Sequence, residues 1–570
     1  MKTPPWFTRN RFLSHLRIVT AGTLVFAAAA IVFIAVRPSS AVARSAPTNN
    51  HVPVTHQHFN SFEAITQLNN GAVSVANLRN PPSPICSTTT SSAANVDTDC
   101  EAVGHNETSI AVNPTNALNL IGSGNDFQLL LTSGGTFYYE TVYRRAHVTF
   151  DGGKTWTTYP IYDNAYDANF DAAVAFDATG RAYLASLGQE FPHASGAFLA
   201  PASDVIVASS TDGGKTWTAP KRVASGLGTI ASAGVVPDKD YIAAWGSGNA
   251  IVTWTAFNQG IGGSYISSPI FASVTHDGGN TWSAPTEISG TAPFCTGAQG
   301  GTKCNQDQFS APTVAADGSI YVAFLNFSTS DSAGHDQYLV VKVDPNTGQR
   351  VAGPYKVSLV YDGFTDYPIN IFGQQTYQDS EFRSNPAGNI AADPTNALHL
   401  AVVWSDMRNS TLPAPSDPYA AVTNSDIIVS QSFNGGVTWS APTALTVARD
   451  QFQPWGAYDA SGKLRIGYFD RSYDAANHKY GYTLATEAAP GTLTFSTTQL
   501  TTALSDPTQG NSWFPYTPNP AFPNPTFSIG DYSGIAVAPS RVVGLWTDKR
   551  VSTCFPFCGT GEEAFFSAAP

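Results

Sequence analysis

The chain has 570 residues, a formal net charge of −13 and only 12% charged residues, where an average soluble protein has about 25%. Residues 1–43 contain five of the 29 Lys and Arg and no Asp or Glu, so the remainder carries a formal charge of −18. A chain this acidic repels phosphate backbones, which excludes nucleic acid as an expected partner. Abundant Gly (48), Pro (38) and aromatic residues (12%) are typical of many short strands joined by turns, so we expect an all-β protein.

The first element in chain order is an apolar helix over residues 18–36, which follows Lys2, Arg9, Arg11 and Arg17. The basic flank, the apolar stretch and the Ala-Val-Ala end predict an export signal cleaved after Ala43. Nineteen apolar residues also suffice for a membrane anchor whose basic flank stays in the cytoplasm. The sequence does not decide between a cleaved signal and an uncleaved membrane anchor. Either one exports the rest of the chain and is its only expected membrane contact.

The six cysteines form three pairs that are close in sequence. An exported chain favours disulfides over free thiols, although the sequence alone leaves the connectivity open. The local pairings that we predict are Cys86 with Cys100, Cys295 with Cys304, and Cys554 with Cys558. Neither a CxxC pair nor a histidine at ligand spacing accompanies them, so we expect no metal site and no cofactor. A structural calcium ion stays open but has no motif to support it.

An eight-residue frame, Ser/Thr-x-Asp/Asn-x-Gly-x-Thr-Trp, occurs four times, at residues 149–156, 210–217, 275–282 and 432–439. We call these boxes 1 to 4. The acidic or amide side chain can accept hydrogen bonds from its own turn, and the glycines supply the positive φ that a tight turn needs. The tryptophan brings a large apolar surface between strands. The residues given this structural role are Asp151, Trp156, Asp212, Trp217, Asp277, Trp282, Asn434 and Trp439.

Seven hairpin-like units of two apolar runs around a turn begin at Ser109, Asp171, Tyr241, Ala311, Asn389, Trp455 and Ser533. Boxes follow units one, two, three and five, each after a further strand-like run. Strand, turn, strand, loop, strand, box and strand make a four-stranded sheet, and such sheets repeated around an axis form a β-propeller. We therefore predict seven four-stranded blades over residues 61–570, after a linker over residues 44–60. Residues 71–78 are expected to complete the last blade.

The box frame resembles the Asp-box, or BNR repeat, of the sialidase superfamily, and the exported part resembles the secreted Asp-box propellers related to sialidases. A six-bladed ring, as in sialidases, is therefore the alternative to seven blades. In sialidases the boxes lie away from the active face. The strand order here predicts the same, because a box lies at the opposite end of its sheet from the loops that enter and leave the hairpin.

Those hairpin loops are polar, and loops on a rigid scaffold commonly carry function. Residues 238–240 and Glu107 lie ahead of hairpins, and Asp126 follows one. Three other loops each place an aromatic residue before an aspartate and an arginine; these pairs are Asp406 with Arg408, Asp470 with Arg471, and Asp548 with Arg550. Each pair is either a salt bridge that fixes its own loop or part of a guanidinium ring that binds a substrate carboxylate.

Sialidases hold the sugar carboxylate with three arginines, attack with a tyrosine that a glutamate activates, and use an aspartate as acid and base. Residues 530–539 resemble the segment that carries this nucleophile, which makes Tyr532 its counterpart. A tyrosine with a pKa near 10 needs an adjacent base. Where sialidases place Glu-Pro, this chain has Gln453-Pro454, so Asp531 or Glu107 would substitute, and Asp126 is a further acid/base candidate.

The chain departs from the sialidase pattern again at its first hairpin, where Glu107 stands near the position of the first clamp arginine. The usual catalytic set is therefore not intact. Aromatic loops over residues 361–382 and 505–527 offer rings that can stack on sugars, with Trp513 as a candidate. Three hypotheses follow: an exo-sialidase-like glycoside hydrolase, a non-catalytic propeller that binds glycan or protein, and a structural exported module. We expect a monomer whose partner is a glycan or glycoconjugate.

Overall fold

The computed structural model describes most of residues 83–570. The stretches outside this description are 101–103, 132–136, 143–144, 163–164, 167, 190–201, 229–231, 328, 371–372, 412–413, 416, 446–447, 510–528 and 555–557. Side chains are also not described for residues 127–131, 137–142, 168, 552–554 and 558–559. The predicted N-terminal helix, the linker and Trp513 therefore lie outside the described residues. Within these residues, no helix is both long enough and apolar enough to cross a membrane.

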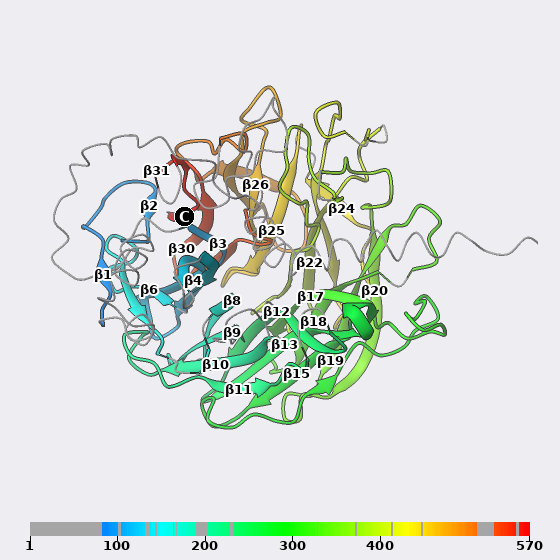
Figure 1. Ribbon diagram of the computed structural model, residues 1–570, viewed down its shortest axis with the longest axis horizontal. Coiled ribbons are helices and arrows are strands. Elements are labelled where there is room, and N and C mark those ends of the chain that lie inside the picture. Colours follow the sequence, from blue (N-terminus) through cyan, green and yellow to red (C-terminus); the bar gives the residue numbers. More distant parts are fainter. Residues whose placement is uncertain are drawn as a thin grey trace, which may run out of the picture.

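The described strands form seven antiparallel blades that follow one another around a ring (Figure 1). Blade 1 contains β3 (Gly104–Asn113), β4 (Asn116–Leu131), β6 (Arg145–Thr149) and β7 (Thr157–Pro160), with β1 (Cys86–Ser87) beside β7 and β5 (Phe137–Val142) beside β4. Blade 2 contains β8 (Ala168–Phe176), β9 (Ala182–Gln189), β10 (Asp204–Ser210) and β11 (Lys221–Ala224). Blade 3 contains β12 (Gly234–Trp245), β13 (Asn249–Gln259), β15 (Ile270–Thr275) and β16 (Thr286–Glu287), with β14 (Tyr265–Ser267) and the short 3-10 turn η1 (Ile261–Gly263) at its edge.

Blade 4 contains β17 (Asp307–Val314), β18 (Ile320–Asn326), β19 (Asp336–Val343) and β20 (Arg350–Val360). Blade 5 contains β21 (Ile390–Ala392), β22 (Leu400–Asp406), β23 (Asp426–Ser432) and β24 (Thr443–Leu445). Blade 6 contains β25 (Gln451–Tyr458), β26 (Leu464–Asp470), β27 (Gly481–Glu487) and β28 (Phe495–Gln499). Blade 7 contains β29 (Gly534–Ala538), β30 (Arg541–Asp548), β33 (Glu563–Ala569) and β2 (Val96–Asp97), and a hairpin of β31 (Ser552–Cys554) and β32 (Cys558–Thr560) lies in the loop before β33.

The seven predicted hairpins are the first two strands of the seven blades, so the predicted fold class and blade number are confirmed. The ring closes as expected, through a strand from the N-terminal side, but that strand is β2. Val96 pairs with Phe566 of β33. The segment that we expected there, residues 71–78, lies outside the described residues, and the strand that pairs with β33 on this side is β2. In Figure 1 the red C-terminal blade accordingly lies beside the blue and cyan first blade.

Apolar side chains fill the space between neighbouring blades, one cluster for each of the seven interfaces. Two-sided burial explains the near-continuous apolar runs in the second strand of each blade. Neighbouring blades approach each other so closely that some positions require glycine. A Cβ on Gly122 of β4 would lie 2.8 Å from the Leu545 side chain of blade 7. The blades are therefore stabilised mainly by their neighbours, as in other repeat folds.

The four boxes form the predicted turn. Asp151 Oδ1 accepts hydrogen bonds from the backbone N–H groups of Lys154 and Thr155, both at 2.9 Å. In box 4, Asn434 Oδ1 still accepts from the N–H of Thr438 at 2.9 Å. The box tryptophans Trp156, Trp217, Trp282 and Trp439 all pack in the apolar cluster between their own blade and the preceding one. The boxes thus join adjacent blades as well as closing a turn.

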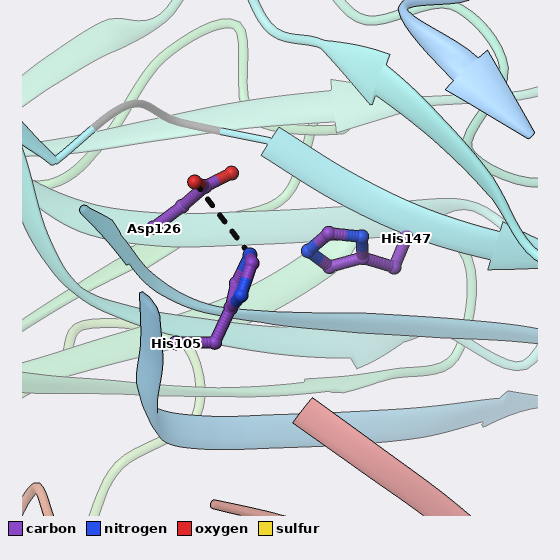
Figure 2. A group of neighbouring side chains, drawn as sticks. All are labelled: His105, Asp126 and His147. Carbon is purple, nitrogen blue, oxygen red and sulfur yellow. Dashed lines mark ion pairs between the residues drawn. The ribbon is translucent and has the colours of Figure 1, made fainter. Parts of the chain in front are cut away.

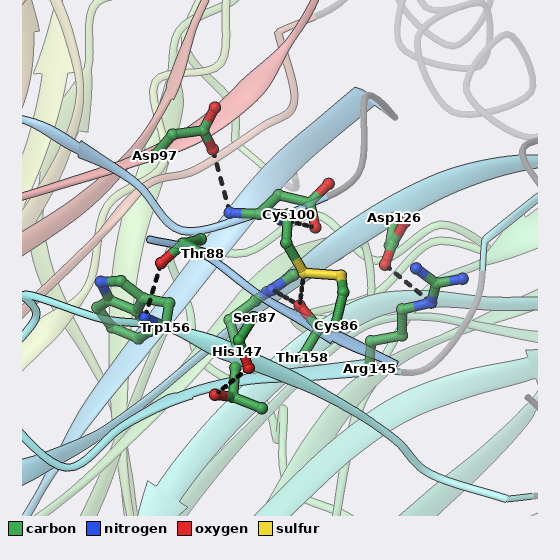
Figure 3. Close-up of a disulfide and its surroundings, with 12 residues drawn as sticks. Cys86, Ser87, Thr88, Asp97, Cys100, Asp126, Arg145, His147, Trp156 and Thr158 are labelled. Atoms are coloured by element: carbon green, nitrogen blue, oxygen red, sulfur yellow. Dashed lines mark hydrogen bonds and ion pairs between the residues drawn. A yellow bond between two sulfur atoms is a disulfide. The ribbon is translucent and has the colours of Figure 1, made fainter. Parts of the chain in front are cut away.

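Two of the predicted disulfides are present, Cys86–Cys100 and Cys295–Cys304. The first disulfide joins Cys86 in β1, at the edge of blade 1, to Cys100, which follows β2 of blade 7. It therefore spans the closure of the ring (Figure 3). Disulfides of this kind persist in oxidising compartments. Cys554 and Cys558 face each other in backbone register across the β31–β32 hairpin, but their side chains lie outside the description, and that pairing stays a prediction.

Candidate functional site

A repeated irregularity in the innermost strands places polar side chains near the propeller axis. In β3, β8, β12, β17 and β25 the pairing with the next strand skips two residues. The first of each pair has a positive φ; these residues are Glu107, Asp171, Lys239, Phe309 and Gln453, with φ of 53°, 57°, 51°, 56° and 49°. Non-glycine residues rarely adopt this conformation, and such strain is concentrated at functional sites.

Lys239 is the centre of this axial cluster. Its Nζ lies 3.1 Å from Glu107 Oε1 of blade 1, 3.3 Å from Asp171 Oδ2 of blade 2 and 2.7 Å from Asp531 Oδ2 beside blade 7. All four side chains are buried. One ammonium group thus joins blade 3 to carboxylates of blades 1 and 2 and of the segment just before blade 7.

Asp531 has a second cation. Arg383, in the segment between blades 4 and 5, donates from Nε to Asp531 Oδ1 at 2.6 Å and also pairs with Asp531 Oδ2 through its terminal nitrogen. Asn385 donates to the backbone carbonyl of Asp531 at 2.9 Å. The carboxylate is thereby held between Arg383 and Lys239, a charge-assisted arrangement that fixes both geometry and ionisation.

The cluster holds more carboxylates than cations, and their pKa values diverge. Burial and the nearby Asp171 raise the pKa of Glu107 well above its usual range. Burial, Asp171 and Asp238 do the same to Asp240, whose two carboxylate oxygens make no hydrogen bond among the described residues. Burial alone would raise the pKa of Asp531, but Arg383 and Lys239 outweigh it and hold that pKa below its usual range. Opposed pKa values in one site are the pattern of an acid and base pair.

Tyr532 lies at the edge of this cluster with its phenol buried. Its hydroxyl makes no hydrogen bond in the described part of the chain. Burial, with Asp171 and Glu107 nearby, raises its pKa well above 10. A nucleophilic tyrosine needs a base within hydrogen-bond reach, and none of the described carboxylates fills that place. The small cavity beside Tyr532, lined also by Lys239, Asp240 and Trp455, has a volume of about 20 Å³, room for water but not for a sugar ring.

Asp126, the fourth acid/base candidate, is not part of the axial cluster. It lies at the end of the register between β3 and β4, opposite His105, and is buried. Its Oδ2 is 3.2 Å from Arg145 Nε. The structure therefore brings together Glu107, Asp531 and Tyr532 of the four candidates and places Asp126 in a separate group between blades 7 and 1.

The predicted Asp and Arg pairs bind within their own loops in two of the three copies. Arg408 contacts both oxygens of Asp406 and stacks over the rings of Tyr361 and Trp404. Arg550 contacts both oxygens of Asp548 in the same way. Because two nitrogens of each guanidinium group donate to an aspartate of the same loop, little is left for a substrate carboxylate, which favours the loop-fixing role.

The third copy differs. Arg471 is fully buried and pairs with Asp450 at 3.3 Å rather than with Asp470, and it donates to the carbonyl oxygens of Gln378 and Asn477. Asp470 instead accepts from the N–H of Ser472 and from Gln451. No two of the three arginines share a pocket among the described contacts, and Trp513 lies outside the described residues.

A partly exposed aromatic pair lies on the same face, between blades 4 and 5. The side chains of Tyr361 and Phe364 are 38% and 45% exposed. The N–H of Tyr361 donates to Asp406 Oδ2, and the Tyr361 ring lies 4.4 Å from that of His335. Phe364 covers Gly334, where any Cβ would overlap its ring. We call Tyr361 and Phe364 the aromatic patch; it is rigidly backed and open to solvent.

The sequence places Asp171 and residues 238–240 ahead of hairpins on this face, but it predicts no role for Asp171 or Lys239, and it does not predict Arg383 there. The signal for Lys239 is positional, because it precedes its hairpin by two residues as Glu107 and Gln453 precede theirs. Arg383 has no comparable signal. Its contact with Asp531 joins segments 148 residues apart.

No family model matches the chain, and no curated protein matches it. Among solved structures, similarity extends to a protein of unknown function from Dyadobacter fermentans, with 12% identity and a TM-score of 0.41 over 84% of this chain and 97% of that one. A Hadza microbial sialidase shows 11% identity and a TM-score of 0.40 over 85% and 95%. A PL25 polysaccharide lyase, an ulvan lyase, shows 12% and 0.40 over 69% and 80%. The fold assignment here depends on this chain's own strand pairing.

Proposed function

We propose that this chain is an exported Asp-box β-propeller that binds a glycan on its loop face without hydrolysing it. The observation that carries this proposal is the contact of Lys239 with Glu107, Asp171 and Asp531. These side chains occupy the axis where a sialidase-like site would open. The buried ion cluster then serves as a plug that holds blades 1, 2, 3 and 7 together.

The aromatic patch supplies the binding surface. Aromatic rings pack on the apolar face of a sugar ring, and 38% of the Tyr361 side chain and 45% of the Phe364 side chain are exposed for such contact. The Asp406 carboxylate accepts from the Tyr361 backbone, and Arg408 covers one side of the Tyr361 ring, so the patch is preorganised. The acidic character of the chain favours neutral or cationic glycans over acidic ones.

A glycan microarray tests this proposal with full-length protein and three variants. Tyr361→Ala and Phe364→Ala are expected to weaken binding by about tenfold each, since one aromatic contact contributes on the order of 1 kcal/mol or more. Phe433→Ala is the matched control, because Phe433 is an exposed ring, 56% accessible, in box 4 on the opposite face. Glycan binding that is unchanged by both patch variants, or no binding by any folded sample, would count against the proposal.

A glycoside hydrolase is the second candidate, and one observation favours it. Glu107 and Asp531 both contact Lys239, and their pKa values are displaced in opposite directions, as an acid and a base require. Catalysis would require Lys239 and Arg383 to leave the carboxylates and the cavity beside Tyr532 to widen. Turnover that depends on Glu107 and Asp531 distinguishes this candidate from the binding propeller.

A further inference from the structure

The seam between blades 7 and 1 buries a second polar cluster, separate from the axial one. His105 of β3, Asp126 of β4 and His147 of β6 come from blade 1, and Figure 2 shows their side chains converging from three neighbouring strands. Asp99, just after β2, and Glu563, at the start of β33, approach from blade 7. All five side chains are buried. Ionisable groups rarely gather in such a place unless something binds them together.

The distances within this seam cluster are too long for hydrogen bonds. His105 Nε2 lies 3.7 Å from Asp99 Oδ2 and 3.6 Å from Asp126 Oδ1, and His105 Nδ1 lies 3.8 Å from Glu563 Oε2. Within the described residues, neither ring nitrogen of His105 makes a hydrogen bond, and neither does His147 Nε2. Buried polar atoms left this way cost about 1–3 kcal/mol each, so three of them at one point require an explanation.

A metal ion explains the spacing. One donor atom from each of His105, Asp126 and His147 can be chosen so that all three lie within 4.8 Å of one another, and the same holds for Asp99, His105 and Glu563. Zinc binds imidazole and carboxylate at about 2.0–2.2 Å, which places donors of a tetrahedral site roughly 3.3–3.6 Å apart. The separations of His105 Nε2 from Asp126 and Asp99, 3.6 and 3.7 Å, therefore need shifts of at most a few tenths of an ångström.

Neighbouring groups outside the cluster contact the polar atoms of these side chains that do not face its centre. Metal ligands are usually oriented in this way. His147 Nδ1 lies 3.1 Å from Thr158 Oγ1, which leaves Nε2 facing His105. Asp126 Oδ2 is paired with Arg145, so that Oδ1 faces His105. Asp99 Oδ1 accepts from the N–H of Cys100, whose disulfide packs beside Thr158 (Figure 3). The orientation of each donor is thus set by the fold.

We propose that this seam cluster binds one divalent first-row metal ion of the zinc type, with His105, Asp126 and His147 as ligands and Asp99 as the nearest fourth donor. Two imidazoles with carboxylates suit zinc and its neighbours, whereas calcium prefers oxygen donors alone. Because its donors come from blades 1 and 7, the ion would reinforce the ring closure beside the Cys86–Cys100 disulfide.

The test uses the purified full-length protein, stripped with a chelator and titrated with Co²⁺ and Zn²⁺ alone. Visible absorption reports the coordination of Co²⁺ directly, elemental analysis gives the Zn²⁺ stoichiometry after dialysis, and thermal unfolding gives the stabilisation. We expect about one equivalent of ion, a Co²⁺ spectrum typical of four nitrogen and oxygen donors, and a Tm raised by several degrees. His147→Gln and Asp126→Asn are expected to weaken binding at least about 100-fold.

His399→Gln is the matched control, because His399 is a buried, carboxylate-paired histidine in blade 5, far from the seam in the ring order. It should bind the ion as the unsubstituted chain does. If a seam variant does not fold, the titration of the unsubstituted chain still decides. Folded protein that holds less than about a tenth of an equivalent and shows no Tm shift overturns the proposal, as does unchanged affinity in both folded seam variants.

Discussion

Lys239 of blade 3 and Asp531 of blade 7 meet at 2.7 Å near the axis of the propeller, although neither is adjacent to the other in the ring. The same ammonium group contacts Glu107 and Asp171 of blades 1 and 2. A buried cation surrounded by carboxylates is stabilised by Coulomb attraction. Removing it would destabilise the fold, because the carboxylates would be left buried without their counter-charge. This cluster therefore ties four blades together near the axis of the propeller.

Replacing the central cation tests this role. Lys239→Met is expected to destabilise the fold by about 3–5 kcal/mol, since it leaves three buried carboxylates with one fewer counter-charge. Denaturant unfolding measures the change. Lys154→Met is the matched control, because Lys154 is an exposed lysine of box 1, and its substitution should stay within about 0.5 kcal/mol. Equal effects of the two variants would show that the axial contacts contribute little.

The pH dependence of stability tests a buried lysine of blade 7. Burial lowers the pKa of Lys549 to about 8, despite the nearby Glu562 and Asp506, and its Nζ makes no hydrogen bond among the described residues. The unfolded chain has a lysine pKa of about 10.4 and so binds more protons between these values, which means that stability rises with pH across that window. Below about pH 8 the full cost of burying the ammonium group is present.

Lys549→Met removes this contribution. We expect the variant to be more stable than the unsubstituted chain at pH 7, by on the order of 2 kcal/mol, with the difference shrinking by pH 10. Unfolding free energies at both pH values measure it. Lys479→Met serves as control, since the Lys479 side chain is 48% exposed beside the same Asp506. A difference for Lys549→Met that does not change with pH would contradict the low pKa.

The hydrogen bonds of a box turn can be tested at Asp212. This carboxylate accepts from the N–H groups of Lys215 and Thr216 and from the Thr216 hydroxyl. Asp212→Ala should cost about 1–2 kcal/mol through the lost bonds. Asp212→Asn should cost clearly less, because Asn434 makes the equivalent bond in box 4. Thermal unfolding compares the two, and equal losses would mean that the turn does not depend on the acceptor.

The contact between a box and the preceding blade can be separated from the turn itself with two glycines. Gly153 and Gly279 occupy the same box position, with φ of 98° and 86°. A Cβ on Gly153 would overlap the Phe566 ring of blade 7, whereas one on Gly279 would have its nearest neighbour at 3.7 Å. Both alanine variants incur the backbone strain of positive φ, but Gly153→Ala should lose at least about 2 kcal/mol more. Similar losses would rule out a tight seam at Phe566.

Much of the fold was predictable because the signals that specify it are local and repeat along the chain. Each hairpin carries its own alternation and turn residues, and each box carries its own acceptor and glycines, so seven units could be counted without any tertiary contact. The closing strand was not predictable in this way. β2 has only two residues, Val96–Asp97, and its partner Phe566 is at the other end of the chain. A strand that short has no periodicity to read.

The site was less predictable, for the same physical reason. The position of Glu107, Asp531 and Tyr532 on one face followed from the hairpin order, but their partners Lys239 and Arg383 come from other blades. The seam cluster draws its five side chains from positions 99 to 563, so no ligand spacing exists in the sequence. Arg408 binds an aspartate of its own loop, whereas Arg471 binds one from a different loop. Only the packing of the folded chain decides between these two outcomes.

The most direct test of the account is a hydrolysis assay on the purified full-length protein with a panel of fluorogenic glycosides that includes a sialoside. We expect no turnover above that of Tyr532→Phe and Glu107→Gln samples, because the Tyr532 hydroxyl has no base beside it among the described residues and because Lys239 and Arg383 hold the axial carboxylates. Turnover by the unsubstituted chain that disappears in the Tyr532→Phe variant would contradict it and establish a tyrosine-dependent glycosidase.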